Sequence, residues 1–321
     1  MSKPVYQGDA TPGDWSVATN WDTGSVPISG DEVYLYSNTD NIEAGLAQSA
    51  VTVDELHIYD SYTGRIGAVT ALVGTELAIN ATLCTIGESF GSGQSAGSDR
   101  VLIDFGSVQT ACSVYKSSLS PADSNRESVR IRGTHASNVV NILGSALVGI
   151  GTNDPDDTAT VTLNAFAGTV NCGIGVTIKN AIVGSDTQSS SVKIWNGLDT
   201  GGVLKLRQGN VWTFGTGTIP TVNQLAGTFY AGSTGTTTTH TVQSGATLKV
   251  VGGAKTISTL NLGGTLDLTE ATGALTVTTF NVIDSSYQII DPNGRLSSQA
   301  IVHASGVRDF AGGYGRTIDV N

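Results

Sequence analysis

Short runs of alternating hydrophobic and polar residues recur along most of the chain. Clear examples are Glu32–Tyr36, Glu76–Ile79, Arg100–Asp104 and Ser128–Arg132. Alternation with a period of two residues is typical of β-strands that bury one face, and turn residues bound most of these runs. No window of ten or more residues has an apolar period of 3.6, so we expect little helix beyond a single turn in Pro121–Ser128.

A repeat is visible in the later part of the chain. Ser244–Val250 and Leu262–Leu268 share the pattern glycine, small, threonine, leucine, polar, aliphatic. Lys255–Leu262 supplies another alternating strand between them, and Gly273–Ile283 is a looser third copy. A period of about 18 to 22 residues that holds short strands predicts a parallel β-helix, or β-solenoid. β-Sandwich domains or a barrel are the alternative fold, because these also contain alternating strands at such spacing.

The composition agrees with an all-β solenoid. Charged residues make up 13% of the chain, against about 25% in typical soluble domains, and 41 of the 321 residues are glycine. Glycine, asparagine and serine suit the corners of a coil, where several residues need a positive φ. Stacked threonine and asparagine side chains can hydrogen-bond along a ladder, whereas stacked like charges repel.

The pattern divides the chain into four regions. Residues 1–50 contain Trp15 and Trp21, few strand-like runs and many acids, so we expect an N-terminal arm and cap. Residues 51–135 form a β-rich module, either solenoid or sandwich. Residues 136–284 form the solenoid. Residues 285–321, which include Gly312–Arg316, form a C-terminal cap or tail.

Charge and targeting features narrow the function. The net charge is −11, which disfavours binding to nucleic-acid phosphates. The chain contains no run of about 18 apolar residues, so no membrane span is predicted. The polar residues that follow Met1 predict a chain without an export signal, made in a cytosol. The three cysteines, Cys84, Cys112 and Cys172, have no CxxC spacing and are expected to be buried thiols without disulfides.

The opening segment carries a recognisable motif. Asn20-Trp21 is followed by Gly24, Val26-Pro27, Gly30-Asp31 and Val33. This arrangement resembles the start of β-helical surface proteins, both autotransporter-like proteins and virion proteins of tailed bacteriophages. Without an export signal, the phage resemblance is favoured. It implies a capsid decoration, or cement, protein on the virion surface that is made in the host cytoplasm.

The resemblance also implies partners and contact residues. The major capsid protein is the expected partner, and elongated coils commonly assemble as homotrimers. We expect residues 1–50 to contact the capsid as a mobile arm through Trp15, Trp21, Pro27 and Tyr34. The two tryptophans are also suited to covering the open end of the coil, where edge strands would otherwise pair with another chain.

Candidate catalytic groups do not form a convincing site in the sequence. Adjacent acids such as Asp31-Glu32 and Asp54-Glu55 point to opposite faces of a strand and so form no catalytic pair. The four histidines lack metal-binding spacing. Gly87–Gly91 matches Gly-x-Ser-x-Gly but precedes a loop instead of a helix. The acids of Asn153–Asp157 lack the spacing of a calcium loop. We therefore predict no enzyme activity, cofactor or metal.

Two tryptophans keep a second function open. Trp195 and Trp212 are separated by nearly one period and are expected to stack on neighbouring turns. Buried, they would be a core ladder or a subunit contact; exposed, they would bind a host glycan. The second hypothesis is therefore a receptor-binding tail spike or fibre, and a polysaccharide-degrading enzyme is the third. Four basic residues of the same region form either a stripe for an acidic partner or a scattered solvated surface: Lys193, Lys205, Arg207 and Lys249.

Overall fold

The computed structural model describes residues 2–8, 13–69, 74–89, 100–116, 127–151, 159–298 and 301–303. The chain is all-β, with parallel strands stacked in a β-solenoid of about 12 turns, which confirms the predicted fold class. It consists of two compact units. Unit 1 comprises residues 1–164 with 168–176, and unit 2 comprises residues 165–167 with 177–321. The described residues contain one helical segment, the 3-10 helix η1 (Ala18–Asn20).

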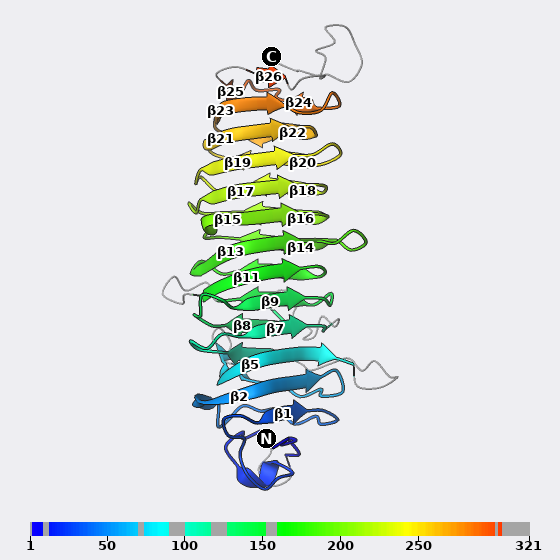
Figure 1. Cartoon of the computed structure of the whole chain (residues 1–321), viewed down its shortest axis with the longest axis vertical. Helices are drawn as coiled ribbons and strands as arrows, with labels where there is room; N and C mark the ends of the chain where they lie inside the picture. Colours follow the sequence, from blue (N-terminus) through cyan, green and yellow to red (C-terminus); the bar gives the residue numbers. More distant parts are fainter. Residues whose placement is uncertain are drawn as a thin grey trace. The chain divides into compact units, whose positions relative to one another are not determined.

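Each turn of unit 1 contributes a strand to one or both of two parallel stacks (Figure 1). The first stack contains β1 (Glu32–Leu35), β2 (Ala47–Tyr59), β5 (Leu77–Glu88), β7 (Ala111–Val114), β9 (Val139–Ile142) and β11 (Ala159–Ala165). The second contains β6 (Val101–Asp104), β8 (Val129–Arg132), β10 (Leu147–Ile150) and β12 (Thr169–Cys172). The long β5 pairs with both β6 and β7, so it contributes to both stacks. A small antiparallel pair, β3 (Ala68–Val69) and β4 (Gly74–Thr75), lies outside the stacks. The region 51–135 therefore contributes parallel solenoid strands.

Unit 2 has the same two-stack arrangement with shorter turns. Its odd-numbered stack contains β13 (Val176–Val183), β15 (Leu198–Leu206), β17 (Ile219–Gln224), β19 (Thr237–Val242), β21 (Lys255–Leu262), β23 (Leu275–Val282), β25 (Leu296–Ser298) and β26 (Ile301–His303). Its even-numbered stack contains β14 (Ser190–Ile194), β16 (Gly209–Thr213), β18 (Thr228–Ala231), β20 (Thr247–Gly252), β22 (Thr265–Ala271) and β24 (Gln288–Ile290).

The core of each unit is built from columns of inward-facing side chains. In unit 2, Val211, Phe229, Leu248 and Leu266 lie in register on successive turns and are buried. A single turn cannot bury its own inward residues, so each strand depends on the strands before and after it. The alternation seen in the sequence follows from this arrangement, because every second residue faces the core.

Glycine corners allow the turns to stack closely. Gly227 has φ +74°, and a Cβ at this position would collide with the backbone oxygen of Gly209 in the preceding turn. A side chain there would be both strained and in collision, so the corner requires glycine.

The predicted repeat is confirmed in its first two copies and wrong in its third. Leu248 pairs with Leu266, so Ser244–Val250 and Leu262–Leu268 occupy equivalent positions in adjacent turns. Gly273–Ile283 contains β23, which pairs with β21 in the other stack. The strand that follows β22 in its own stack is the short β24. The helical turn expected over Pro121–Ser128 falls mostly on residues outside the described ones, as does Gly312–Arg316.

Candidate functional site

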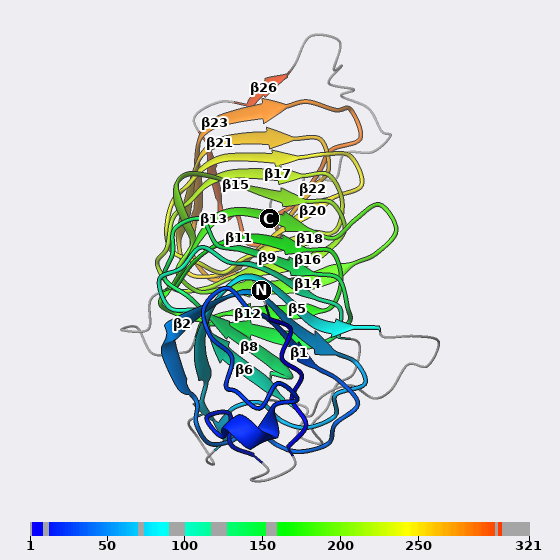
Figure 2. The same cartoon turned by 60° about the horizontal axis from the view of Figure 1, so that its bottom comes forward.

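The N-terminal segment closes the first turn of unit 1 (Figure 2). Residues 2–6 run alongside β1: the backbone N–H of Glu32 donates to Ser2, and that of Tyr34 donates to Pro4. Trp15 and Trp21 pack edge to face with ring centroids 4.7 Å apart, and Trp21 Nε1 donates to the Trp15 carbonyl at 2.9 Å. Both rings are almost fully buried. Residues 2–6 and the two packed tryptophans together form the cap. Its residues 2–6 occupy the hydrogen-bonding edge of β1, which would otherwise be free to pair with another chain.

Burial changes the role of three predicted contact residues. Trp15 and Trp21 are 0% and 2% exposed, and Pro27 is also buried, so these side chains form the cap and present no surface to a partner. The region is packed against β1 over residues 2–6, in contrast to the mobile arm that we expected.

The loop after the cap holds one large apolar side chain in solvent. Ile28 is 66% exposed. The buried Asp31 carboxylate accepts hydrogen bonds from the backbone N–H groups of Ile28 and Ser2, at 3.0 and 3.1 Å. Gly30 and Ser29 are in turn hydrogen-bonded to Thr52 of β2. Ile28 is therefore exposed on a loop that is fixed in place.

Tyr34, the fourth predicted contact residue, lies on the outer face of β1. Its ring stacks on His57 with centroids 4.9 Å apart, and its hydroxyl donates to Glu32 at 2.8 Å. Lys3 forms an ion pair with Glu32 and lies 5.9 Å from the Tyr34 ring. Tyr34 is half-buried and remains accessible beside the cap.

The two later tryptophans do not stack on each other, which corrects that expectation. Trp195 stacks on Phe214 with centroids 4.5 Å apart, and Trp212 stacks on Tyr230 at 4.9 Å. Trp212 is in register with Lys193, because one turn here is longer than the spacing between the two tryptophans. Trp212 and Tyr230 lie on the outer face of β16 and β18, whereas Trp195 and Phe214 directly follow β14 and β16. None of the four rings is fully buried, so neither pair is a core ladder. Trp195 is 40% exposed, whereas Trp212 is half-buried.

The basic residues of this region do not form one stripe. Lys193 and Lys249 belong to the same outward column of the even-numbered strands, separated by Trp212 and Tyr230. Lys249 is paired with Glu270 at 2.7 Å, which raises the pKa of its ammonium group. Lys205 lies on β15 in the other stack. Arg207 pairs with Asp186 at 3.1 Å.

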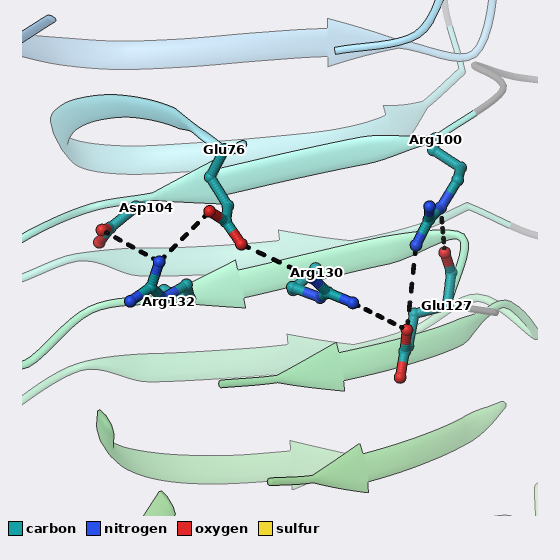
Figure 3. Close-up of polar contacts among 6 residues, drawn as sticks. All are labelled: Glu76, Arg100, Asp104, Glu127, Arg130 and Arg132. Atoms are coloured by element: carbon teal, nitrogen blue, oxygen red, sulfur yellow. Dashed lines mark hydrogen bonds and ion pairs between the residues drawn. The ribbon is translucent and has the colours of Figure 1, made fainter. Parts of the chain in front are cut away.

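A network of six charged side chains in unit 1 escaped the sequence analysis (Figure 3). Glu76 lies between two arginines, with its oxygens 3.6 Å from Arg130 Nη1 and 3.2 Å from Arg132 Nη1. Glu127 lies 3.4 Å from Arg130 Nη2. At the two ends, Arg100 Nε donates to the Glu127 carbonyl at 2.9 Å and Asp104 lies 4.0 Å from Arg132.

The network is balanced in charge and largely shielded. It contains three arginines and three carboxylates, and the side chains of Glu76 and Arg100 are only 9% and 7% exposed. Each carboxylate lies within 4.0 Å of a guanidinium, so the six side chains hold one another in place. The sequence alone could not show the network, because Asp104 and Arg132 are recognisable as neighbours only once their register on adjacent turns is known.

The other candidate residues from the sequence have structural roles wherever the structure describes them. Glu32 and Glu55, from the two adjacent acid pairs, bond to Lys3 and His57 respectively. The three cysteines are buried and free, and burial raises the pKa of the Cys172 thiol to about 12. Asn153–Asp157 and the end of Gly87–Gly91 fall outside the described residues.

In the described part of the chain, no group of three or more metal-binding side chains lies together. None of its helices is long and apolar enough to cross a membrane.

Comparisons with known proteins do not place this chain in a family. No protein-family model, curated protein or solved structure matches it.

Proposed function

We propose that the chain is a capsid decoration protein of a tailed bacteriophage, located on the virion surface and bound to the major capsid protein. The proposal starts from the resemblance of the opening segment to β-helical virion proteins. In this role the protein stabilises the capsid because each bound subunit adds binding free energy to the assembled shell alone. A homotrimer made in the host cytoplasm belongs to the same proposal.

The observation that carries the proposal is the exposed Ile28 on a loop whose backbone is held by hydrogen bonds, beside the capped end of the solenoid. A loop whose backbone is ordered before binding loses less conformational entropy on contact with a partner. Buried Asp31 holds the loop through the Ile28 N–H, and the packed cap prevents β1 from pairing with strands of other chains. The expected contact residues are therefore the exposed Ile28 and the half-buried Tyr34 on the outer face of β1, in place of the two buried tryptophans.

The direct test is co-sedimentation with expanded capsids that lack the protein. Wild-type chain should sediment with the capsids, and Ile28→Asp should weaken binding about tenfold or more, as loss of a central apolar contact does. Ile174→Asp is the matched control, because Ile174 is also exposed, at 41%, and lies in unit 1. Absence of co-sedimentation would reject the capsid role, and equal binding by both variants would reject the Ile28 contact.

A point variant is preferable to deletion of residues 1–30. Deletion would remove Ser2–Tyr6 and expose the edge of β1, so lost binding would not distinguish a missing contact from aggregation.

The second candidate is glycan binding by a receptor-recognition protein, and the exposed Trp195 favours it. Sugar rings stack on the faces of aromatic rings, and stacking within a ladder uses those faces. Trp195 and Trp212 each stack on one neighbouring ring, but Trp195 is 40% exposed whereas Trp212 is half-buried. Trp195→Ala should therefore abolish binding to a glycan array while Trp212→Ala retains it. Absence of glycan binding by the wild-type chain would remove this candidate.

A further inference from the structure

One outer face of unit 2 has a regular, uncharged surface. Thr221, Thr239, Thr259 and Thr279 lie in register on β17, β19, β21 and β23, which Figure 1 shows stacked one above another. Further along the same strands, Asn223, Thr241, Asn261 and Asn281 form a second column. We refer to these two columns as the threonine face.

The threonine face differs from the rest of this acidic chain in its charge. The strands of this face carry almost no charge: the acidic and basic residues of β17, β19 and β23 amount to His240 alone, and it is buried. The one charge of β21 is Lys255, which is 5% exposed and donates to the Ser233 carbonyl. The outer face of the even-numbered strands carries Lys193, Lys249 and Asp267 in one column. The absence of charge is therefore specific to one face of the unit.

The polar groups of the second column are already partly satisfied within the ladder. Asn261 Nδ2 donates to Thr241 Oγ1 at 3.1 Å, and Asn281 Nδ2 donates to Asn261 Oδ1 at 2.8 Å. Removing these groups from water costs less than removing amides that have no partner. The face is suited to contact with another uncharged surface.

We propose that the threonine face is the surface through which the protein binds a second copy of itself. Two chains of net charge −11 repel each other, and the repulsion is smallest where uncharged faces meet. A second copy also presents the same spacing between turns, so the rows of side chains can interdigitate. This proposal does not depend on the capsid role.

The area is sufficient for a reversible contact. Four turns about 4.8 Å apart and strands of about six residues give a flat surface of about 400 Å². The exposed Val302 of β26 extends the second column by a turn at one end, whereas the exposed Lys205 of β15, in register with Asn223, ends the uncharged surface at the other. The total for two copies then reaches about 1,000 Å², at the lower limit of specific interfaces. We expect association that depends on concentration.

Sedimentation velocity of the full chain over a range of concentrations tests the proposal. The double variant Thr239→Lys/Thr259→Lys places two charges on the face and should shift the association midpoint by at least tenfold. Thr228→Lys/Thr247→Lys is the matched control, since these threonines are also half-buried and in register, on β18 and β20. The control should associate like the wild-type chain.

Salt gives a second readout. Because no ion pair crosses the proposed contact, screening of the net charge should strengthen association, whereas an interface of ion pairs would weaken. The mass of the complex distinguishes a dimer, in which the face meets itself, from a trimeric ring. A wild-type chain that remains monomeric at every concentration, or equal association by the two double variants, would overturn the proposal.

Discussion

The two units build the same kind of coil with turns of different length. In unit 1, one column of register partners steps from Cys84 to Cys112 and then to Val140. In unit 2 the steps are shorter, as from Val211 to Phe229 or from Leu248 to Leu266. The longer turns of unit 1 leave more conformational entropy in the unfolded chain for the same number of stacked strands.

Each unit has its own means of stabilisation. Unit 1 contains the tryptophan cap and the arginine–carboxylate network, which are both specific to particular turns. Unit 2 relies on short turns and repeated ladders such as Thr241, Asn261 and Asn281. The comparison teaches that stability is concentrated at a few residues in unit 1 and distributed over many in unit 2.

Removal of the cap should have the largest effect. Trp21→Ala deletes a fully buried ring that contacts Trp15 and Tyr6, and should lower the free energy of unfolding of unit 1 by about 4 kcal/mol. Hydrogen exchange should report the loss first in β1. Trp195→Ala in unit 2 is the control and should cost about 1 kcal/mol, because the exposed ring loses mainly its stacking with Phe214. Equal losses would contradict the assigned role of the cap.

Neutralising the centre of the charged network should have the next largest effect. Glu76→Gln leaves Arg130 and Arg132 without their shared carboxylate in a shielded site, at an expected cost of about 3 kcal/mol. The control is Glu43→Gln, which breaks the more exposed Arg65–Glu43 pair of the same unit and should cost less than about 1 kcal/mol. Urea denaturation of both variants measures the difference. A Glu76→Gln cost no larger than that of Glu43→Gln would show that the network is energetically equivalent to a surface pair.

The difference in turn length also explains what the sequence could predict. Alternating strands such as Lys255–Leu262 were predicted with their observed bounds because apolar inward residues alternate with polar outward ones over most of their length. The solenoid was recognisable in unit 2, where one short turn aligns Leu248 with Leu266 and the similar sequence around each. In unit 1 the longer turns differ in sequence from one to the next, and the repeat was not visible.

Side-chain environment was harder to predict than fold. The pairing of Trp195 with Phe214 depends on the length of one turn, and a small error in that length assigned Trp195 to the wrong partner. Opposite charges at Asp104 and Arg132 are informative only once the register of unit 1 is known. Trp15 and Trp21 were expected both to cover the open end of the coil and to contact a partner, and their sequence context could not show that both rings are buried.

Acid should act on unit 2 through its buried histidine. His240 is fully buried, its Nε2 lies 3.2 Å from Gln224 Oε1, and burial lowers its pKa from 6.5 to about 3. The folded state therefore binds fewer protons than the unfolded state between these values, so stability is complete above about pH 6.5 and falls as the pH decreases toward 3. The expected loss is about 1.4 kcal/mol per pH unit.

The variant His240→Gln isolates this contribution, because glutamine is polar and does not titrate. Urea denaturation at pH 6 and pH 5 should show a fall in stability that is about 1 kcal/mol smaller in His240→Gln than in the wild-type chain. Equal falls in the two proteins would show that other groups account for the acid sensitivity.

The smallest expected effect tests whether ladders contribute equally in both units. Asn261→Ala removes hydrogen bonds to Thr241 and from Asn281 and should cost about 1 kcal/mol, because half-buried hydrogen bonds contribute modestly. Asn141→Ala is the counterpart in unit 1, where Asn141 donates to Ser113 and accepts from Asn164. If stability is local to each ladder, the two losses agree within about 0.5 kcal/mol. A much larger loss for Asn261→Ala would show that the short turns of unit 2 transmit a local defect to neighbouring turns, as expected when each turn is stabilised mainly by its neighbours.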